Sequence, residues 1–307
     1  YQAIPGSYGR GRYHEGQTLG EIYGFEFDRF FEESDFSGKN GSQWIYKDGV
    51  ASQVPLQATG SFVYGPGDVK YKDLDGDGKI TIGDPNMKDE EGNPIPVASV
   101  RNHGDTKVIG NMLPRYEYSF RLGAAWKGFD VDLYFQGVGK RNMWYVSSYI
   151  IPMAQSNGTG IFEHQLDCNS YIFDANNNIT GYNVDQNNFY PVPYASGFSY
   201  AALSNNMLGQ GAYNFLPSDR YLLNMAYLRL KNVTVGYTLP IEITKKALIQ
   251  KARVYFSTEN PCFIYNGANR YKIDPEINTG EGGMGVGAYG RTNPMMASYS
   301  FGIQVTF

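Results

Sequence analysis

The clearest pattern along the chain is an alternation of apolar and polar residues with a period of two. From Tyr116 to Trp126 every second side chain is apolar or aromatic, and after Lys127-Gly128 the alternation resumes from Phe129 to Gln136. A period of two is typical of β-strands, because successive side chains of a strand point to opposite faces. The two segments, separated by a two-residue turn, therefore predict a tight antiparallel hairpin.

The second face of this hairpin is charged. Glu117 and Arg121 lie on it in the first segment, and Asp130 and Asp132 lie on it in the second. Charged groups are costly to bury in a dry core, whereas the lumen of a membrane barrel is filled with water. The hairpin therefore favours a β-barrel wall with one face toward lipid and the other toward water.

Six segments show this alternation and are expected to be strands. They cover residues 21–31, 115–126, 129–137, 227–237, 252–259 and 298–307. In the fourth segment the apolar positions change phase between Leu230 and Val233, which predicts a β-bulge near Lys231 and Asn232.

The connections between these strands alternate in length. Long connections cover residues 32–114, 138–226 and 260–297, and the links between them are short. Long extracellular loops that alternate with short periplasmic turns are typical of outer-membrane barrels. Because such a barrel needs about eight strands or more and tolerates no open edge in lipid, further strands are expected elsewhere. The chain also starts at Tyr1 without an export signal, so it is expected to be part of a longer protein.

Composition supports a β-rich protein. It argues against a protein with membrane-spanning helices and against a nucleic-acid-binding protein. Aromatic residues make up 15% of the chain, glycines number 37 and only 18% of residues are charged, a balance typical of strands and turns. No stretch approaches the roughly 18 consecutive apolar residues of a membrane-spanning helix. The net charge of −4, with both signs well mixed, leaves no basic surface for nucleic acid. Cys168 and Cys262 lie outside any metal-binding spacing, and one long-range disulfide between them stays open.

Residues 73–84 match the twelve-residue calcium loop in the spacing of their oxygen ligands. Carboxylates stand at loop positions 1, 3, 5 and 12, with Gly at 6 and Ile at 8. The expected Ca²⁺ ligands are Asp73, Asp75, Asp77, Lys79 through its carbonyl, Thr81 directly or through water, and Asp84. Asp at position 12 is shorter than the usual Glu, which weakens binding. A structural calcium clip in the first long loop is expected, and a solvated Asp/Gly turn is the alternative.

No pattern for catalysis is supported. The run from Gly280 to Gly285 matches a dinucleotide-binding pattern, but no buried strand precedes it and no helix follows it. The three histidines are scattered, and no Gly-x-Ser-x-Gly motif occurs. Asp130 and Asp132 could be compared with the paired acids of a glycosidase. They stand two residues apart on a predicted strand, however, and are explained more simply as part of the lining of the lumen. The protein is therefore expected not to be an enzyme.

The second long loop is rich in aromatic residues that could stack on sugar rings or peptide side chains. The candidate substrate contacts are Trp144, Tyr145 and Tyr149. The alternative is that these residues only pack within the loop.

Several segments together resemble the C-terminal part of the SusC/RagA-like TonB-dependent outer-membrane transporters of Bacteroidetes. The resemblance is carried by residues 16–25, 67–73, 75–78, 109–116, 126–130, 135–137, 227–232 and 236–240, and by the terminal Phe307. It implies a barrel of about 22 strands with an N-terminal plug, energised by TonB and covered outside by a SusD-like lipoprotein that helps to capture glycans or peptides. The plug and the TonB-contacting segment are not among these residues.

Pattern and resemblance together predict an all-β chain that forms strands and long extracellular loops of a substrate importer in the outer membrane. The expected partners are a SusD-like surface lipoprotein, TonB through a segment outside this chain, outer-membrane lipid, and a glycan or peptide substrate. The alternative is a secreted, calcium-stabilised β-sandwich that acts as an adhesin or binding module.

Overall fold

The structure is a computed structural model that describes residues 17–57, 62–95, 97, 99, 101–144, 152, 161–194, 210–277 and 295–307. The chain divides into two compact units. The first, here the loop unit, comprises Tyr1–Leu113, Met143–Leu223 and Gly280–Gly290; the second, here the sheet unit, comprises Pro114–Asn142, Asn224–Thr279 and Arg291–Phe307.

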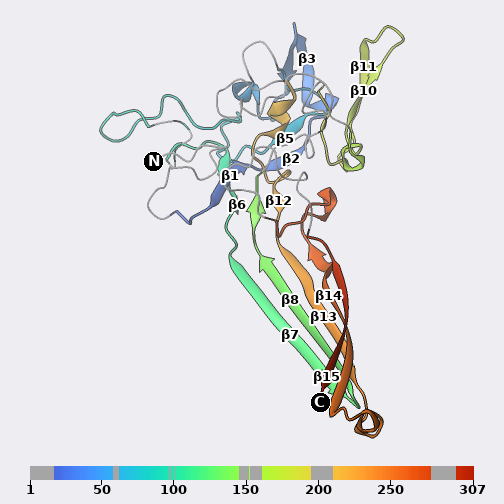
Figure 1. The fold of residues 1–307 in the computed structure, drawn as a ribbon. Helices are drawn as coiled ribbons and strands as arrows, with labels where there is room; N and C mark the ends of the chain where they lie inside the picture. The colour runs from blue at the N-terminus through green and yellow to red at the C-terminus, as the bar shows by residue number, and fades with distance from the viewer. Residues whose placement is uncertain are drawn as a thin grey trace. The chain divides into compact units, whose positions relative to one another are not determined.

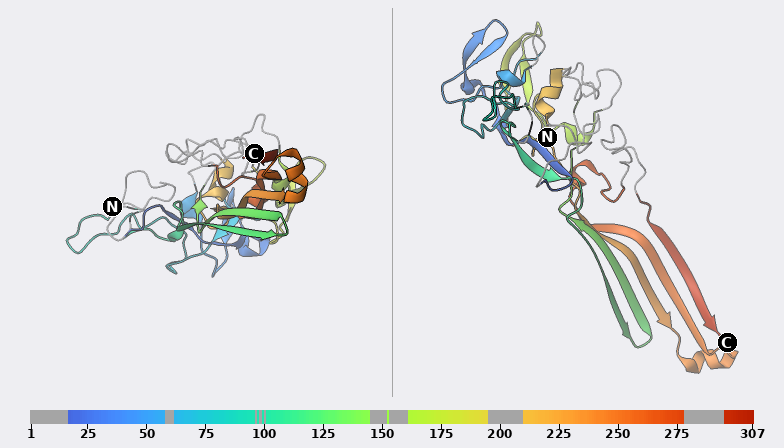
Figure 2. Two further views of the ribbon diagram at one scale, coloured as in Figure 1. Left: turned by 60° about the horizontal axis from the view of Figure 1, so that its bottom comes forward. Right: turned by 90° about the vertical axis from the view of Figure 1, so that its left-hand side faces the viewer.

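The sheet unit is built on one antiparallel sheet of five long strands. In chain order they are β7 (Tyr116–Trp126), β8 (Phe129–Gly139), β13 (Tyr227–Thr238), β14 (Lys251–Asn266) and β15 (Ser298–Thr306). Their order in the sheet is β15-β14-β13-β8-β7, so every strand lies beside its neighbour in sequence (Figures 1 and 2). Five of the six expected strand segments are therefore found side by side, and β14 extends beyond the expected residue 259 to Asn266.

Two of the connections within this sheet are short. Lys127 and Gly128 join β7 to β8 with φ angles of 48° and 87°, as a two-residue type I′ turn needs. The helix α2 (Ile241–Thr244) and the 3₁₀ turn η5 (Lys245–Ala247) join β13 to β14. Pairing of β13 with both neighbours shifts register between Leu230 and Asn232, which confirms the predicted bulge.

The register separates the side chains of the sheet into two faces. Phe120, Phe135 and Leu230 are paired across adjacent strands and share one face with the other apolar positions. Gly302 pairs with Tyr255 on the other face, where the tyrosine ring covers the glycine: a Cβ on Gly302 would lie 2.3 Å from that ring. A glycine at this position therefore lets an aromatic side chain lie flat across two strands.

The loop unit contains short, two-stranded sheets. They pair β1 (Glu21–Phe25) with β6 (Thr106–Asn111), β2 (Phe27–Phe30) with β5 (Val69–Tyr71), β3 (Phe36–Asn40) with β4 (Gln43–Tyr46), and β10 (Ser170–Phe173) with β11 (Ile179–Asn183). Its 3₁₀ turns are η1 (Glu33–Asp35), η2 (Val54–Leu56), η3 (Glu163–Gln165) and η4 (Gln210–Phe215). The sheet unit contains the 3₁₀ turn η6 (Asn269–Tyr271) in addition to η5. The short strands β9 (Asn142–Met143) and β12 (Leu223–Asn224) span the points where the chain passes between units.

The prediction of a single strand at residues 21–31 is wrong. It forms two strands, β1 and β2, which pair with β6 and β5 in the loop unit rather than with the long sheet. The change of partner falls at Glu26, whose carbonyl accepts a hydrogen bond from the N–H of Lys72, while the N–H of Phe27 donates to Asp219. The alternation of Tyr23, Phe25 and Phe27 resembled one strand because each short strand continues the phase of the other.

Aromatic residues form the core of the loop unit. Buried Phe31, Phe36, Phe62, Tyr64 and Tyr213 pack together, and Trp44 and Tyr46 pack against them. Apart from Phe31, these residues come from both of the expected long loops, 32–114 and 138–226, so the two loops fold around one shared core. Long connections are rarely structureless, and here they supply their own sheets and apolar cluster.

The described elements are almost entirely strands and turns, which confirms the all-β class; α2, with four residues, is the α-helix among them. Among the residues that the structure describes, no helix has the length and apolar character needed to cross a membrane.

Candidate functional site

The Asp-rich loop, residues 73–84, follows β5 in the loop unit and is folded by its own carboxylates. One oxygen of Asp73 accepts the N–H of Gly76 at 2.7 Å, and the other accepts the N–H of Gly78 at 2.9 Å. Both glycines have φ near 80°, a conformation that other residues rarely adopt. The spacing of Asp and Gly thus produces a tight turn that points its backbone donors at the first carboxylate.

Two more carboxylates repeat this local pattern. Asp75 accepts the N–H of Asp77, and Asp77 accepts the N–H of Lys79 at 2.7 Å. One oxygen each from Asp73, Asp75 and Asp77 lies within 4.8 Å of the others. Three negative charges this close repel one another, and carboxylate oxygens are ligands that Ca²⁺ prefers. The chemistry of this donor set fits a calcium ion.

Ile80 anchors the loop to the body of the unit. Its side chain has no exposed surface, and its N–H donates to the carbonyl of Ser52 at 2.9 Å. The N–H of Ser52 in turn donates to the carbonyl of Gly78 at 2.9 Å. The apolar residue at loop position 8 therefore fixes the loop in place through both burial and backbone pairing.

The other expected ligands have different contacts. The hydroxyl of Thr81 accepts the N–H of Gly83, and the carboxylate of Asp84 accepts the N–H of Asn86 at 2.8 Å. Asp84 is not part of the described carboxylate cluster, which contains Asp73, Asp75 and Asp77. Of the four expected carboxylate ligands, the structure thus brings together Asp73, Asp75 and Asp77. Lys79 was expected to contribute only its carbonyl.

Asp105 is a member of this region that sequence reasoning missed. It is fully buried, one oxygen accepts the N–H of Leu74 at 2.7 Å, and the other accepts the N–H of Thr81 at 2.7 Å. The pKa of Asp105 is raised above its ordinary value, mainly by burial. The two N–H donors lower this pKa, whereas the nearby Asp75 and Asp73 raise it. Asp105 therefore braces both ends of the Asp-rich loop.

No local signal could have identified Asp105, because it lies beyond the motif and reaches it only in the folded chain. The neighbouring Gly104 allows that approach: a Cβ there would lie 2.5 Å from the hydroxyl oxygen of Thr81. A glycine is also suited to the φ of 52° that this residue adopts.

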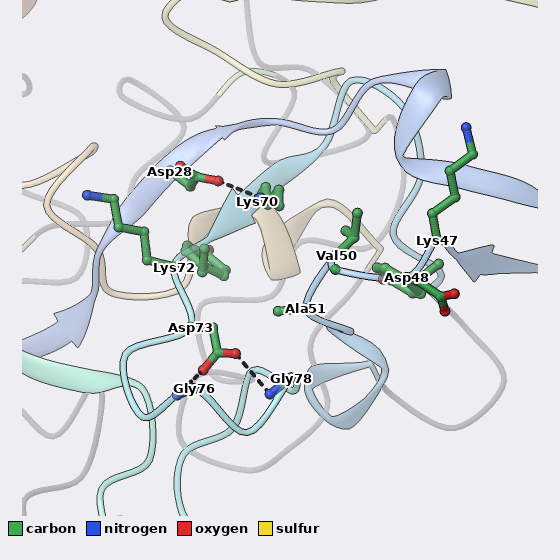
Figure 3. Close-up of a pocket in the computed structure, with 13 residues that line it drawn as sticks. Asp28, Lys47, Asp48, Val50, Ala51, Lys70, Lys72, Asp73, Gly76 and Gly78 are labelled. Atoms are coloured by element: carbon green, nitrogen blue, oxygen red, sulfur yellow. Dashed lines mark hydrogen bonds and ion pairs between the residues drawn. The ribbon is translucent and has the colours of Figure 1, made fainter.

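A pocket of about 560 Å³ adjoins the Asp-rich loop (Figure 3). Asp73, Gly76 and Gly78 form one wall, residues 46–51 form another, and Asp28 and Lys70 line the side toward β2 and β5. Asp28 and Lys70 form an ion pair at 2.5 Å. The pocket and the Asp-rich loop therefore share Asp73, Gly76 and Gly78.

The residues expected to contact substrate are only partly described. Trp144 is buried, with 5% of its surface exposed, and its indole nitrogen has no hydrogen-bond partner in the described part of the chain. Tyr145 and Tyr149 lie outside the described residues. Cys168 is partly buried in the loop unit, Cys262 is exposed on β14, and both are free thiols.

Comparison with known proteins identifies the relatives of this chain. TonB-dependent receptor P3 of Formosa agariphila is 24% identical to it over 267 residues, which are 86% of this chain and 19% of the receptor. The chain is similar to TonB-dependent receptors. This confirms the resemblance that the sequence segments indicate, although no family model matches the chain.

Solved structures of the RagAB peptide importer also align with the chain. In the "closed-closed" state the alignment covers 94% of this chain and 23% of the other, with 18% identity and a TM-score of 0.45. In the "open-open" state it covers 97% and 24%, with 17% identity and a TM-score of 0.46. The chain thus spans about a fifth of the curated relative's length and about a quarter of the solved chains' lengths.

We expect Asp77→Ala to weaken Ca²⁺ binding by about tenfold or more, because it removes one of three clustered carboxylates. The measurement is calorimetric titration of the purified full-length protein with calcium. The matched control is Asp174→Ala: Asp174 is exposed and also accepts backbone N–H groups, those of Asn176 and Asn178, in the turn between β10 and β11. Equal calcium affinity of both variants and the unchanged protein would show that the Asp-rich loop is not the site.

Proposed function

We propose that this chain forms part of the wall and the outer loops of a TonB-dependent substrate importer in the outer membrane, without enzymatic activity. The observation that carries the proposal is the apolar face of the five-stranded sheet. Phe301 is 84% exposed and Ile303 is 74% exposed on this face. Its other exposed members are Tyr116, Tyr118, Phe120, Leu122, Trp126, Phe129, Val235, Val254, Tyr299 and Val305.

Such a surface suits lipid rather than water. Soluble monomers rarely expose a continuous apolar patch that runs over several strands. In an outer-membrane barrel the lipid-facing positions form an apolar band, with aromatic residues toward the two interfaces. Trp126 and Phe129 beside the turn, and Tyr116 at the other end of β7, are placed as such interfacial residues would be.

The opposite face of the sheet carries paired charges. Arg121 and Asp132 lie 2.7 Å apart, and Arg253 and Asp130 lie 2.5 Å apart. The hydroxyl groups of Thr234 and Ser257 lie 3.0 Å apart on the same face. These groups would be poorly placed in lipid, and a water-filled lumen would hydrate them.

The two edges of the sheet require further strands. Among the described strands, β7 pairs only with β8, and β15 pairs only with β14. Unpaired backbone groups in hydrocarbon cost several kcal/mol each, so these edges would be closed by other parts of a longer protein. We propose a complete barrel of about 22 strands, which is the size of outer-membrane transporters with a plugged lumen.

The loop unit is proposed to lie outside the cell. There it would contact a SusD-like lipoprotein that covers the entrance and a glycan or peptide substrate, with Trp144, Tyr145 and Tyr149 as candidate contacts. Ca²⁺ held by Asp73, Asp75 and Asp77, with Lys79, Thr81 and Asp84 as further candidate ligands, would act as a structural clip. TonB would act through a plug that lies outside these residues.

The test is the behaviour of the full-length protein in fractionated cells. A membrane barrel should sediment with the outer membrane, dissolve only in detergent, and migrate differently on a gel before and after boiling. The secreted β-sandwich alternative predicts a protein that is soluble without detergent and shows no heat-modified migration. Deletion of the gene should abolish growth on the imported glycan or peptide, and the SusD-like lipoprotein should copurify with the intact transporter.

A further inference from the structure

Asp68, directly before β5, is a fully buried carboxyl group in the loop unit. Its oxygens accept hydrogen bonds from the N–H of Gly65 at 2.9 Å, the side-chain amide of Asn214 at 2.7 Å and the hydroxyl of Tyr194 at 3.0 Å. All three donors are electrically neutral. In the part of the chain that the structure describes, Asp68 forms no ion pair with a Lys, Arg or His.

Among the residues that the structure describes, the titratable groups that face Asp68 from the packed elements are tyrosines. They are Tyr46 on β4, Tyr64, Tyr71 on β5, Tyr171 on β10, and Tyr194. Burial raises the pKa of each of these hydroxyls, so they stay neutral in the physiological range. A tyrosine carries no positive charge in either state, so none of them balances the charge of Asp68. Burial raises the pKa of Asp68 to about 7, while Asn214, Gly65 and Tyr194 oppose that rise.

The hydroxyl of Tyr194 links this carboxyl to the hairpin of β10 and β11. It lies 2.9 Å from the hydroxyl of Tyr171, and either oxygen can donate. Tyr171 also packs edge-on against Tyr182 of β11, with ring centroids 5.6 Å apart, and Tyr182 packs edge-on against Trp44 at 5.8 Å. Tyr171 therefore lies where the hairpin packs against the aromatic core.

The direction of this hydrogen-bond chain depends on whether Asp68 carries a proton. When Asp68 is ionised, Tyr194 donates to it, and Tyr171 is free to donate to Tyr194. When Asp68 is neutral, its O–H must donate to Tyr194, because Gly65 and Asn214 offer only N–H groups on that side. Tyr194 then donates to Tyr171. Both states keep the hydrogen bonds that join Asp68, Tyr194 and Tyr171, but with opposite polarity.

We propose that Asp68, Tyr194 and Tyr171 form a proton relay that couples the protonation of the loop-unit core to the attachment of the β10–β11 hairpin. A proton taken up by Asp68 allows the carboxyl to remain buried without charge. Loss of that proton leaves a buried anion without a cation, which favours an opened state in which water reaches the carboxylate and Tyr171 loses its partner. The relay is independent of the importer proposal, because it depends only on contacts inside the loop unit.

The sign of the pH effect follows from the two states of Asp68. Its pKa is about 7 when buried and near 3.8, its ordinary value, when the site is open. Between these values the closed state binds one more proton than the open state, so stability of the closed state falls as pH rises. The population of the open state should increase about tenfold per pH unit over that window and level off above pH 7.

Hydrogen exchange of the full-length protein tests the relay. After correction for the intrinsic pH dependence of exchange, amides of residues 170–183 should lose protection with rising pH up to about 7. Asp68→Asn should remove this dependence, because it cannot ionise. In Tyr194→Phe, which removes only the linking hydroxyl, Asp68 should still titrate but hairpin protection should no longer follow pH.

A second measurement keeps the proposal testable if Asp68→Asn fails to fold. The infrared carbonyl band of a buried protonated carboxyl should disappear in the unchanged protein with a midpoint near pH 7. Hairpin protection that is independent of pH in the unchanged protein would overturn the relay. An identical pH dependence in Tyr194→Phe, whose ring is retained, would also overturn it.

Discussion

Replacing Ile303 and Val305 together with aspartate should nearly abolish the folded, membrane-inserted form of the protein. Both residues lie on the apolar face of β15, paired with Val254 and Ala252 of β14. A charged side chain facing lipid costs roughly 2–4 kcal/mol at the midplane for Arg or Lys and somewhat less for Asp, so two of them remove much of the stability of a typical domain. The measurement is the amount of heat-modifiable protein in the outer-membrane fraction.

The matched control for this variant is Gln304→Asp. Gln304 lies between the two positions but on the opposite face, paired with Arg253. We expect it to assemble almost normally, because its carboxylate would meet water and a guanidinium group. Deleting Phe307, a large apolar residue that follows β15 and is 81% exposed, should also lower assembly rather than transport per molecule. Equal assembly of all three variants would exclude the lipid-facing assignment of this sheet face.

The second large effect is expected at Arg229 on β13. Its guanidinium is 2.6 Å from Asp274 and 2.5 Å from Glu276, and it lies 3.8 Å from the ring centre of Phe263. Lys231 also binds Glu276, at 2.7 Å. Arg229→Ala would leave two carboxylates with a single ammonium group in a buried site. Removing one partner of a buried pair costs about 3–5 kcal/mol.

Chemical or thermal denaturation of the purified protein in detergent measures this loss of stability. The matched control is Arg253→Ala, which breaks the more exposed pair with Asp130 and should cost about 0–1 kcal/mol. Adding Asp274→Asn to Arg229→Ala should recover part of the lost stability, because it removes one of the buried charges left without a partner. Equal destabilisation by Arg229→Ala and Arg253→Ala would mean that the Arg229 network is no more than a surface pairing.

Alternation along the sequence determined most of the long sheet. In β7, β8 and β15 each side chain has one of two environments, so a period of two is visible residue by residue. Lys127-Gly128 indicated the turn because two adjacent residues must adopt positive φ there. The folding of the Asp-rich loop was equally local, since each carboxylate binds N–H groups two to five residues away.

Only the tertiary structure decided which segments meet. Residues 21–31 alternate like one strand, yet their partners change at Glu26, because pairing depends on β5 and β6, far along the chain. Asp105, Asp68 and Arg229 each bind groups that are remote in sequence, and no periodic pattern or motif marks such contacts. Side-chain period and turn chemistry act within a few residues and can be read locally. Burial and long-range hydrogen bonding arise only when distant segments fold together.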